Sequence, residues 1–147
     1  MSVTDGPEDD DATPLHPALR RVAAPPMGAL LGFELVEVSG GRAVMQVAPR
    51  AEHENGGGVT HGGLTASLID SATGCAILSA VAADAVIATV DLNITYARPI
   101  PIDGGTLTAT ATVDHLGRTV AVASCEVRDP KGRVVTLGRA TYAVRTR

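Results

Sequence analysis

Apolar and polar residues alternate with a period of two along much of the chain, which is the pattern of half-buried antiparallel strands. In one segment the apolar residues Val90, Leu92, Ile94 and Tyr96 are separated by single polar residues. Short turns rich in Gly, Pro, Asp and Ser separate most of these segments, so neighbouring strands are expected to form hairpins. The predicted strands are 30–38, 42–48, 89–96, 106–113, 119–128 and 133–144.

The stretch 62–82 has the periodicity of a helix instead. A glycine-rich loop leads into it, as expected for a loop that feeds a helix N-terminus. At about 100° per residue, one stripe of side chains should pack on the sheet. The stripe comprises Leu64, Leu68, Ala72, Cys75, Ala76 and Ser79. The order of elements predicts an α+β fold, with one long helix against an antiparallel sheet of about six strands.

Length and composition indicate one folded domain. The chain has 147 residues, of which 45% are hydrophobic, enough for a sizeable core. Residues 1–13 hold five carboxylates and no Lys or Arg; the remainder has 12 basic and 11 acidic residues, which gives no basic surface for nucleic acid. We expect residues 1–26 to form a mobile acidic tail and a short helix, with His16 at the surface, and residues 27–147 to form the domain.

Neither a secretory leader nor an apolar stretch that could span a membrane is found, so we expect a cytoplasmic protein without membrane contact. Cys75 and Cys125 are expected to be reduced core residues. The four histidines are scattered, at 16, 53, 61 and 115, and no metal site is expected.

Asp70 lies on the side of the predicted helix opposite the apolar stripe. Its neighbours on the helical wheel are small, so the backbone of another element could approach closely there. These neighbours are Ala66, Ser67, Thr73 and Gly74. An ordinary solvated aspartate is the alternative interpretation.

The helix opens with His61-Gly62-Gly63, which is expected to present unpaired backbone N–H groups and the positive end of the helix dipole. Such a terminus can polarise a carbonyl group. Gly62 and Asp70 are eight residues apart, roughly 12 Å along a helix, whereas a base and a polarising group must both lie about 3 Å from one reacting centre. A second copy, packed antiparallel, would bring Asp70 of one chain close to Gly62 of the other.

These residues carry a family resemblance. Asn55, His61-Gly62-Gly63, Asp70 and the segment 89–96 (TVDLNITY) resemble the acyl-CoA thioesterases of the hotdog fold. The likeness is to the phenylacetic-acid-pathway (PaaI-like) type and to the small mitochondrial enzyme called thioesterase superfamily member 2. It extends from about residue 27 to residue 144.

The resemblance implies a long central helix wrapped by a curved antiparallel sheet. It also implies homodimers joined edge to edge, usually paired again into tetramers, with active sites between subunits. The implied reaction is hydrolysis of acyl-CoA to the free acid and CoA, with CoA as part of the substrate and no metal or other cofactor.

The resemblance also implies roles for single residues. Asp70 would be a general base for water, or a nucleophile that forms a mixed anhydride, and the Gly62 N–H would polarise the thioester carbonyl. His61 would position the thioester or cap the helix, and Asn55 would hold the water or form a plain turn. Thr89 matches a water-orienting hydroxyl, although the alternation places its side chain on the face opposite Val90 and Leu92.

For the coenzyme A portion, the resemblance indicates the strand end near 96–99 and the turn near 115–118, with arginines for the phosphates; solvated loop charges are the alternative. The acyl pocket is expected to include Leu64, Leu68 and Met27. The candidate substrate-binding residues are Gly63, Asp91, Tyr96, Arg98, Pro99, His115, Leu116, Gly117 and Arg118.

Two other functions compete with hydrolysis. A non-catalytic acyl-CoA-binding hotdog module would keep the fold without needing Asp70. A hotdog dehydratase would need a catalytic histidine paired with a helix acid in another arrangement, which the spacing from His61-Gly62-Gly63 to Asp70 disfavours.

Overall fold

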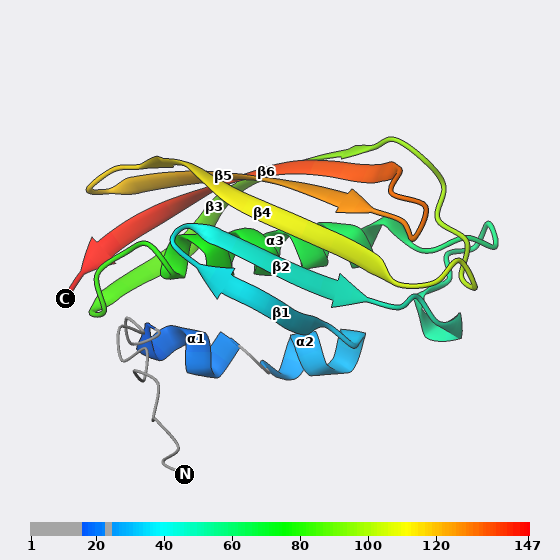
Figure 1. Cartoon of the computed structure of the whole chain (residues 1–147), viewed down its shortest axis with the longest axis horizontal. Coiled ribbons are helices and arrows are strands. Elements are labelled where there is room, and N and C mark those ends of the chain that lie inside the picture. Colours follow the sequence, from blue (N-terminus) through cyan, green and yellow to red (C-terminus); the bar gives the residue numbers. More distant parts are fainter. Residues whose placement is uncertain (1–15, 23–24) are drawn as a thin grey trace, which may run out of the picture.

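The computed structural model describes residues 16–22 and 25–147; the predicted acidic tail, up to residue 15, lies outside this part of the chain. A long helix is followed by the four longest strands (Figure 1). The elements are α1 (Pro17–Val22), α2 (Pro26–Leu31), β1 (Glu34–Ser39), β2 (Arg42–Val47), η1 (Ala51–His53), α3 (Gly62–Leu78), β3 (Ala85–Tyr96), β4 (Leu107–Leu116), β5 (Val120–Arg128) and β6 (Val134–Thr146).

All six strands form one sheet in the order β1-β2-β4-β5-β6-β3, and every neighbouring pair is antiparallel. The predicted α+β architecture is confirmed. The sheet curves around α3, and β1 and β3 are its two edges (Figure 1). Because β3 leaves the helix and crosses to pair with β6, the first strand after the helix becomes an edge.

The sheet encloses α3 more completely than the helical wheel indicates. The predicted apolar stripe is buried from Leu64 to Ala76, but Ile69 and Ile77 on other faces are also fully buried. Thr73, one of the small residues beside Asp70, is fully buried against β6, so at this position another element of the same chain approaches the helix. The strands pack on two sides of the helix and leave only a narrow strip of it half-exposed.

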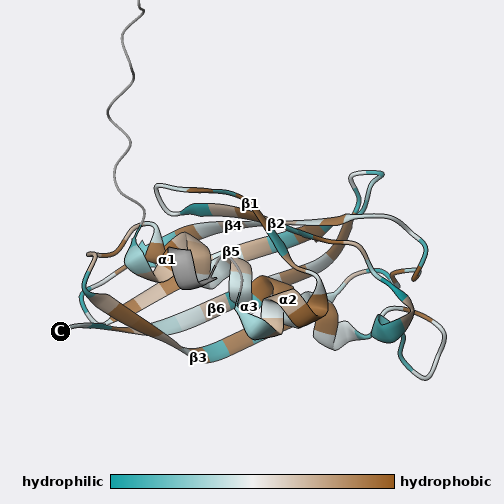
Figure 2. Ribbon diagram, turned by 90° about the horizontal axis from the view of Figure 1, so that it is seen from below, coloured by the Kyte–Doolittle hydropathy of each residue, from teal (hydrophilic) through white to brown (hydrophobic). Residues whose placement is uncertain are grey.

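The N-terminal segments differ from the prediction. The segment 26–31, part of which was assigned to a strand, is the helix α2: Pro26 occupies its first turn, where a missing N–H is harmless, and Gly32 ends it with a φ of 81°. His16 is 7% exposed rather than a surface residue, because its Nε2 lies 2.9 Å from the Ala82 carbonyl oxygen. This contact holds α1 beside the end of α3, and Figure 2 shows α1 and α2 over the open side of the sheet.

A β-bulge interrupts β3. Thr89 pairs with Tyr142, and the next pair is Asp91 with Thr141, which leaves Val90 as an extra residue. The alternation of side chains between the two faces of the sheet is therefore shifted by one residue at this point. Thr89 before the bulge and Ile94 after it both face the helix, whereas Val90 is 63% exposed. The prediction that one alternation runs through the whole strand is wrong.

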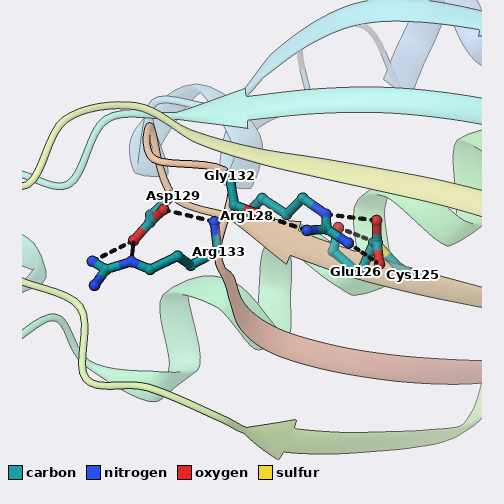
Figure 3. A network of polar contacts seen from close by, with 6 residues as sticks. All are labelled: Cys125, Glu126, Arg128, Asp129, Gly132 and Arg133. Atoms are coloured by element: carbon teal, nitrogen blue, oxygen red, sulfur yellow. Dashed lines mark hydrogen bonds and ion pairs between the residues drawn. The ribbon is translucent and has the colours of Figure 1, made fainter.

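The hairpin between β5 and β6 is closed by charged side chains (Figure 3). Arg128 donates to the Glu126 carboxylate and to the Gly132 carbonyl oxygen. Asp129 accepts the backbone N–H groups of Lys131 and Arg133 at 3.0 Å and also pairs with the Arg133 guanidinium. These local bonds define the turn that aligns β5 with β6.

Both cysteines are free and buried, as predicted. Burial raises the pKa of the Cys75 thiol to about 12, and burial with the nearby Glu126 carboxylate does the same for Cys125. Neither thiol is a candidate nucleophile in the folded chain, since the thiolate is the reactive form.

Candidate functional site

Two strands anchor the Asp70 side chain. The Thr89 hydroxyl on β3 donates to Asp70 Oδ1 at 2.8 Å, and the Tyr142 hydroxyl on β6 donates to the same oxygen at 3.0 Å. Asp70 is half-buried and lines a cleft of about 370 Å³ together with both donors and with Ala18 of α1. A carboxylate oriented in this way is pre-organised to accept a proton or to attack a carbonyl carbon.

The β3 bulge gives Thr89 this orientation. Strict alternation along β3 would have placed the Thr89 side chain on the outer face, away from Asp70. Because Val90 is extra, Thr89 and Tyr142 stand opposite each other on the helix face, and both reach Asp70. The alternation in the sequence put the Thr89 side chain on the face opposite Val90 and Leu92, and it gave no indication that this side chain would contact Asp70.

The helix N-terminus forms the other half of the candidate site. His61 caps α3, because its Nδ1 accepts the Gly63 N–H at 2.8 Å. The Gly63 N–H is thus occupied, contrary to the expectation that both glycines present unpaired groups. Among the described residues, no acceptor meets the Gly62 N–H, which remains the donor for a ligand oxygen.

Tyr96 explains why residue 62 is glycine. The Tyr96 hydroxyl donates to the Gly62 carbonyl oxygen at 2.8 Å, and its ring packs on the Gly62 backbone. A Cβ at position 62 would lie 2.7 Å from the ring. Tyr96 therefore favours glycine at position 62. Because glycine has no side chain, the Gly62 N–H at the start of the helix stays uncovered.

A second cleft, of about 380 Å³, surrounds this helix end. Asn55, Arg98 and Pro99 line it with Gly62 and Tyr96. The Asn55 side-chain oxygen accepts the N–H groups of Gly57 (2.8 Å) and Val59 (3.3 Å), which is the turn-forming role that the sequence left open.

The two clefts share no lining residue, so one chain does not bring Gly62 and Asp70 together. They lie on the same helix at the spacing predicted, with Gly62 at its first residue and Asp70 eight residues later.

Other predicted site residues lie apart from both clefts. Asp91 pairs with Thr141 after the bulge and is exposed. The turn with the predicted residues His115, Leu116, Gly117 and Arg118 lies at the opposite end of the sheet from Tyr96, next to Val144 (Figure 1).

The residues expected around the acyl pocket lie outside both clefts. Leu64 and Leu68 are 4% and 0% exposed and belong to the hydrophobic core, and Met27 on α2 is exposed. Within residues 16–22 and 25–147, no group of three or more His, Cys, Asp and Glu side chains could hold a metal ion. In the same part of the chain, no helix is both long and apolar enough to cross a membrane.

Sequence reasoning missed Tyr142. Its hydroxyl contacts the Asp70 carbonyl oxygen at 2.6 Å in addition to the carboxylate, and it also meets Thr73 Oγ1 at 2.9 Å. The residue lies 72 positions from Asp70, and in the sequence it is one more residue of an alternating strand. Only the pairing of β3 with β6 across the helix could have indicated it.

The long helix wrapped by one antiparallel sheet is the hotdog fold, and the comparisons with known proteins agree with it. Residues 57–136 match the family model described as the thioesterase superfamily. The chain is 34% identical to human acyl-coenzyme A thioesterase 13 over 73% of its length and 76% of that protein. It is 36% identical to the acyl-coenzyme A thioesterase PaaI of Escherichia coli over 74% of its length and 75% of that protein.

The solved structure of the Escherichia coli PaaI protein from the phenylacetic acid degradation operon superimposes with a TM-score of 0.78 and 28% identity. The match covers 86% of this chain and 88% of that one. The chain therefore belongs to the thioesterase superfamily, and it is a thioester hydrolase of the PaaI-like type with the hotdog fold.

Proposed function

We propose that this protein hydrolyses acyl-CoA thioesters at a site shared by two copies of the chain. Asp70 of one copy and the Gly62 N–H of the other would face the same thioester. The observation that carries the proposal is the placement of these two groups in separate clefts on one rigid helix. Roughly 12 Å of helix separates them, and both must come within about 3 Å of the reacting atoms.

The edge strand β3 supports self-association. Its outer rim is unpaired in the chain, and the residues Val86, Val90 and Leu92 are exposed apolar side chains on it. An unpaired apolar edge is a template for pairing with a second strand. Two-fold pairing of β3 with its copy would set the two α3 helices antiparallel, in a homodimer that we expect to pair again into a dimer of dimers.

We place the coenzyme A arm in the Gly62 cleft. The human and Escherichia coli relatives are named acyl-coenzyme A thioesterases, and this cleft offers Asn55, Tyr96 and the Arg98 guanidinium to a pantetheine arm and a phosphate. The turn at 115–118 would contact the nucleotide only if it came from another copy.

In the proposed reaction, Asp70 takes a proton from water while the water oxygen bonds to the thioester carbon. The Gly62 N–H stabilises the oxyanion, the C–S bond breaks, and the proton passes from Asp70 to the CoA thiolate. In the alternative route, the Asp70 carboxylate attacks the carbon and expels the CoA thiolate, and water then cleaves the mixed anhydride. If water attacks the Asp70 carboxyl carbon of this anhydride, a single turnover in ¹⁸O-labelled water transfers label to Asp70, whereas the general-base route puts the label only in the product acid.

The experiment that tests the proposal is a thiol-release assay on aromatic and straight-chain acyl-CoAs. We expect Asp70→Asn to lower turnover at least about 100-fold while the oligomer and the melting temperature persist. Asp84→Asn, an exposed carboxylate in the loop after α3, is the matched control and should retain wild-type turnover. An inactive wild-type protein that still binds acyl-CoA would instead support the non-catalytic binding module.

A further inference from the structure

Tyr142 is buried where the helix meets the sheet, and the hydrolytic steps above give it no role. It is 3% exposed and lies on β6, opposite Thr89 of β3. Its hydroxyl oxygen contacts three oxygen atoms of α3: Asp70 Oδ1, the Asp70 carbonyl oxygen and Thr73 Oγ1. A buried phenol needs only one good partner, so this convergence calls for a reason.

The protons available decide which of these contacts is made. A tyrosine hydroxyl has one proton to donate, and Thr73 can donate its own to the Ile69 carbonyl oxygen at 2.8 Å. Hydrogen bonds to an ionised acceptor are roughly twice as strong as neutral ones, so the Tyr142 proton goes to Asp70 while the carboxylate is charged. Burial raises the pKa of the Tyr142 phenol above its usual range, which keeps the hydroxyl a donor.

Both donors to the carboxylate use the same oxygen. Thr89 and Tyr142 each bond to Oδ1, and among the described residues none donates to Oδ2. The carboxyl group is therefore fixed at one oxygen from two neighbouring strands, and the other oxygen is left for water or substrate.

We propose that Tyr142 is a positioning residue that orients the Asp70 carboxylate by holding its Oδ1. This inference rests on the proposed function of Asp70 and extends it to a residue on another strand. When Asp70 accepts a proton during the reaction, the Tyr142 hydroxyl can turn to the Asp70 carbonyl oxygen, which lies 2.6 Å away. The hydroxyl can thus change its acceptor when the carboxylate is protonated, without any movement of β6.

The surroundings of the carboxylate are otherwise poor in charge. Among the described residues that line its cleft, only Tyr142 and Arg147 carry another titratable side chain; Ala18 of α1, Ser71 and Gly74 of α3, and Thr89 of β3 carry none. A change in the carbon-13 signal of the Asp70 carboxyl on removal of the phenol can therefore be assigned to this hydrogen bond.

Tyr142→Phe is the test, because it keeps the ring and removes the hydroxyl. We expect kcat for phenylacetyl-CoA or hexanoyl-CoA to fall about 10-fold with little change in KM, less than for Asp70→Asn. The carbon-13 signal of the Asp70 carboxyl should also shift in this variant, without any substrate, because one donor to its Oδ1 has been lost.

Thr136→Val is the structural control. Thr136 is a fully buried residue of the same strand, and its hydroxyl donates to Thr65 of α3 at 3.2 Å. This variant should lose stability as Tyr142→Phe does, but its kcat and the Asp70 carbon-13 signal should stay unchanged. If Tyr142→Phe lowers stability and leaves both kcat and the Asp70 signal unchanged, Tyr142 is only a packing residue and the inference is overturned. Full activity in Asp70→Asn would overturn the proposed function instead, and the carbon-13 signal would still test the role of Tyr142.

Discussion

The two ends of the candidate site are built in different ways. At Gly62 the reactive group is a backbone amide, exposed by the absence of a side chain and held by a local cap and the Tyr96 ring. At Asp70 the reactive group is a side chain, fixed by hydroxyls from two strands that are distant in sequence. The first end is a property of one loop and one helix start, whereas the second depends on the whole sheet being in register.

The largest expected effect comes from two substitutions at Gly62. They test whether activity depends on the backbone N–H of this residue or on its lack of a side chain. Gly62→Ala and Gly62→Pro both place a Cβ against Tyr96, but only proline removes the N–H. Proline suits this first helical position, and His61 before it already has the extended conformation that proline requires. We expect Gly62→Pro to lower kcat by about 100- to 1000-fold, and Gly62→Ala by much less. Equal losses in the two variants would mean that space, and not the amide, matters there.

The next effect concerns the hydroxyl on β3. Thr89→Val removes the donor to Asp70 Oδ1 and keeps the shape, so kcat should fall about 10-fold. Thr89→Ser keeps the hydroxyl and should retain most of the activity. Steady-state kinetics with one acyl-CoA compare the two variants, and similar losses in both would exclude a role for the hydroxyl.

A smaller effect is expected at Gly74, where the helix makes room for Tyr142. A Cβ at this position would lie 3.3 Å from the Tyr142 hydroxyl oxygen, which its three contacts keep from moving freely. Gly74→Ala should therefore lower kcat about threefold, although alanine favours helix by about 1 kcal/mol over glycine. Kinetics and thermal melting measure both consequences. Unchanged kcat would show that the Tyr142 hydroxyl tolerates displacement.

The smallest expected effect is a pH dependence of stability near the Gly62 end of the site. His53 is the buried last residue of η1, before Gly62 in the sequence, and its Nδ1 accepts the Arg50 N–H. Burial, with the Arg50 charge, holds the pKa of His53 below its ordinary value of 6.5. In the window below 6.5 the unfolded chain binds the proton and the folded chain does not, so stability present above this window is lost as the pH falls.

His53→Asn removes this titration and keeps an acceptor near the Arg50 N–H. Between pH 7.5 and pH 5.5 the melting temperature of the wild type should therefore fall about 2–4 °C more than that of the variant. Parallel pH curves for the two proteins would contradict the assignment to His53.

The Gly62 end could be predicted because its signals are local. Gly62 and Gly63 after a histidine indicate the start of a helix, and α3 begins at the predicted residue. The strands after the helix were found with small errors: β3 begins four residues earlier than predicted, at Ala85, and α3 ends at Leu78 rather than near residue 82.

The support of Asp70 could not be predicted because it depends on a bulge. Val90 is as apolar as Leu92, so the alternation continues through the extra residue and gives no sign of it. Tyr142 becomes relevant only when β6 pairs with the strand before the bulge. His16 was misjudged for a related reason, since its partner is a carbonyl oxygen 66 residues away.

The most direct test of the central claim is complementation between two inactive variants. Asp70→Asn and Gly62→Pro are refolded together in equal amounts, and mixed oligomers are verified by native mass spectrometry. If the site is shared, each mixed dimer contains one intact pair, Asp70 from one chain and the Gly62 amide from the other, and random mixing restores about a quarter of wild-type turnover. Mixed dimers that remain as inactive as either variant alone would contradict the shared site.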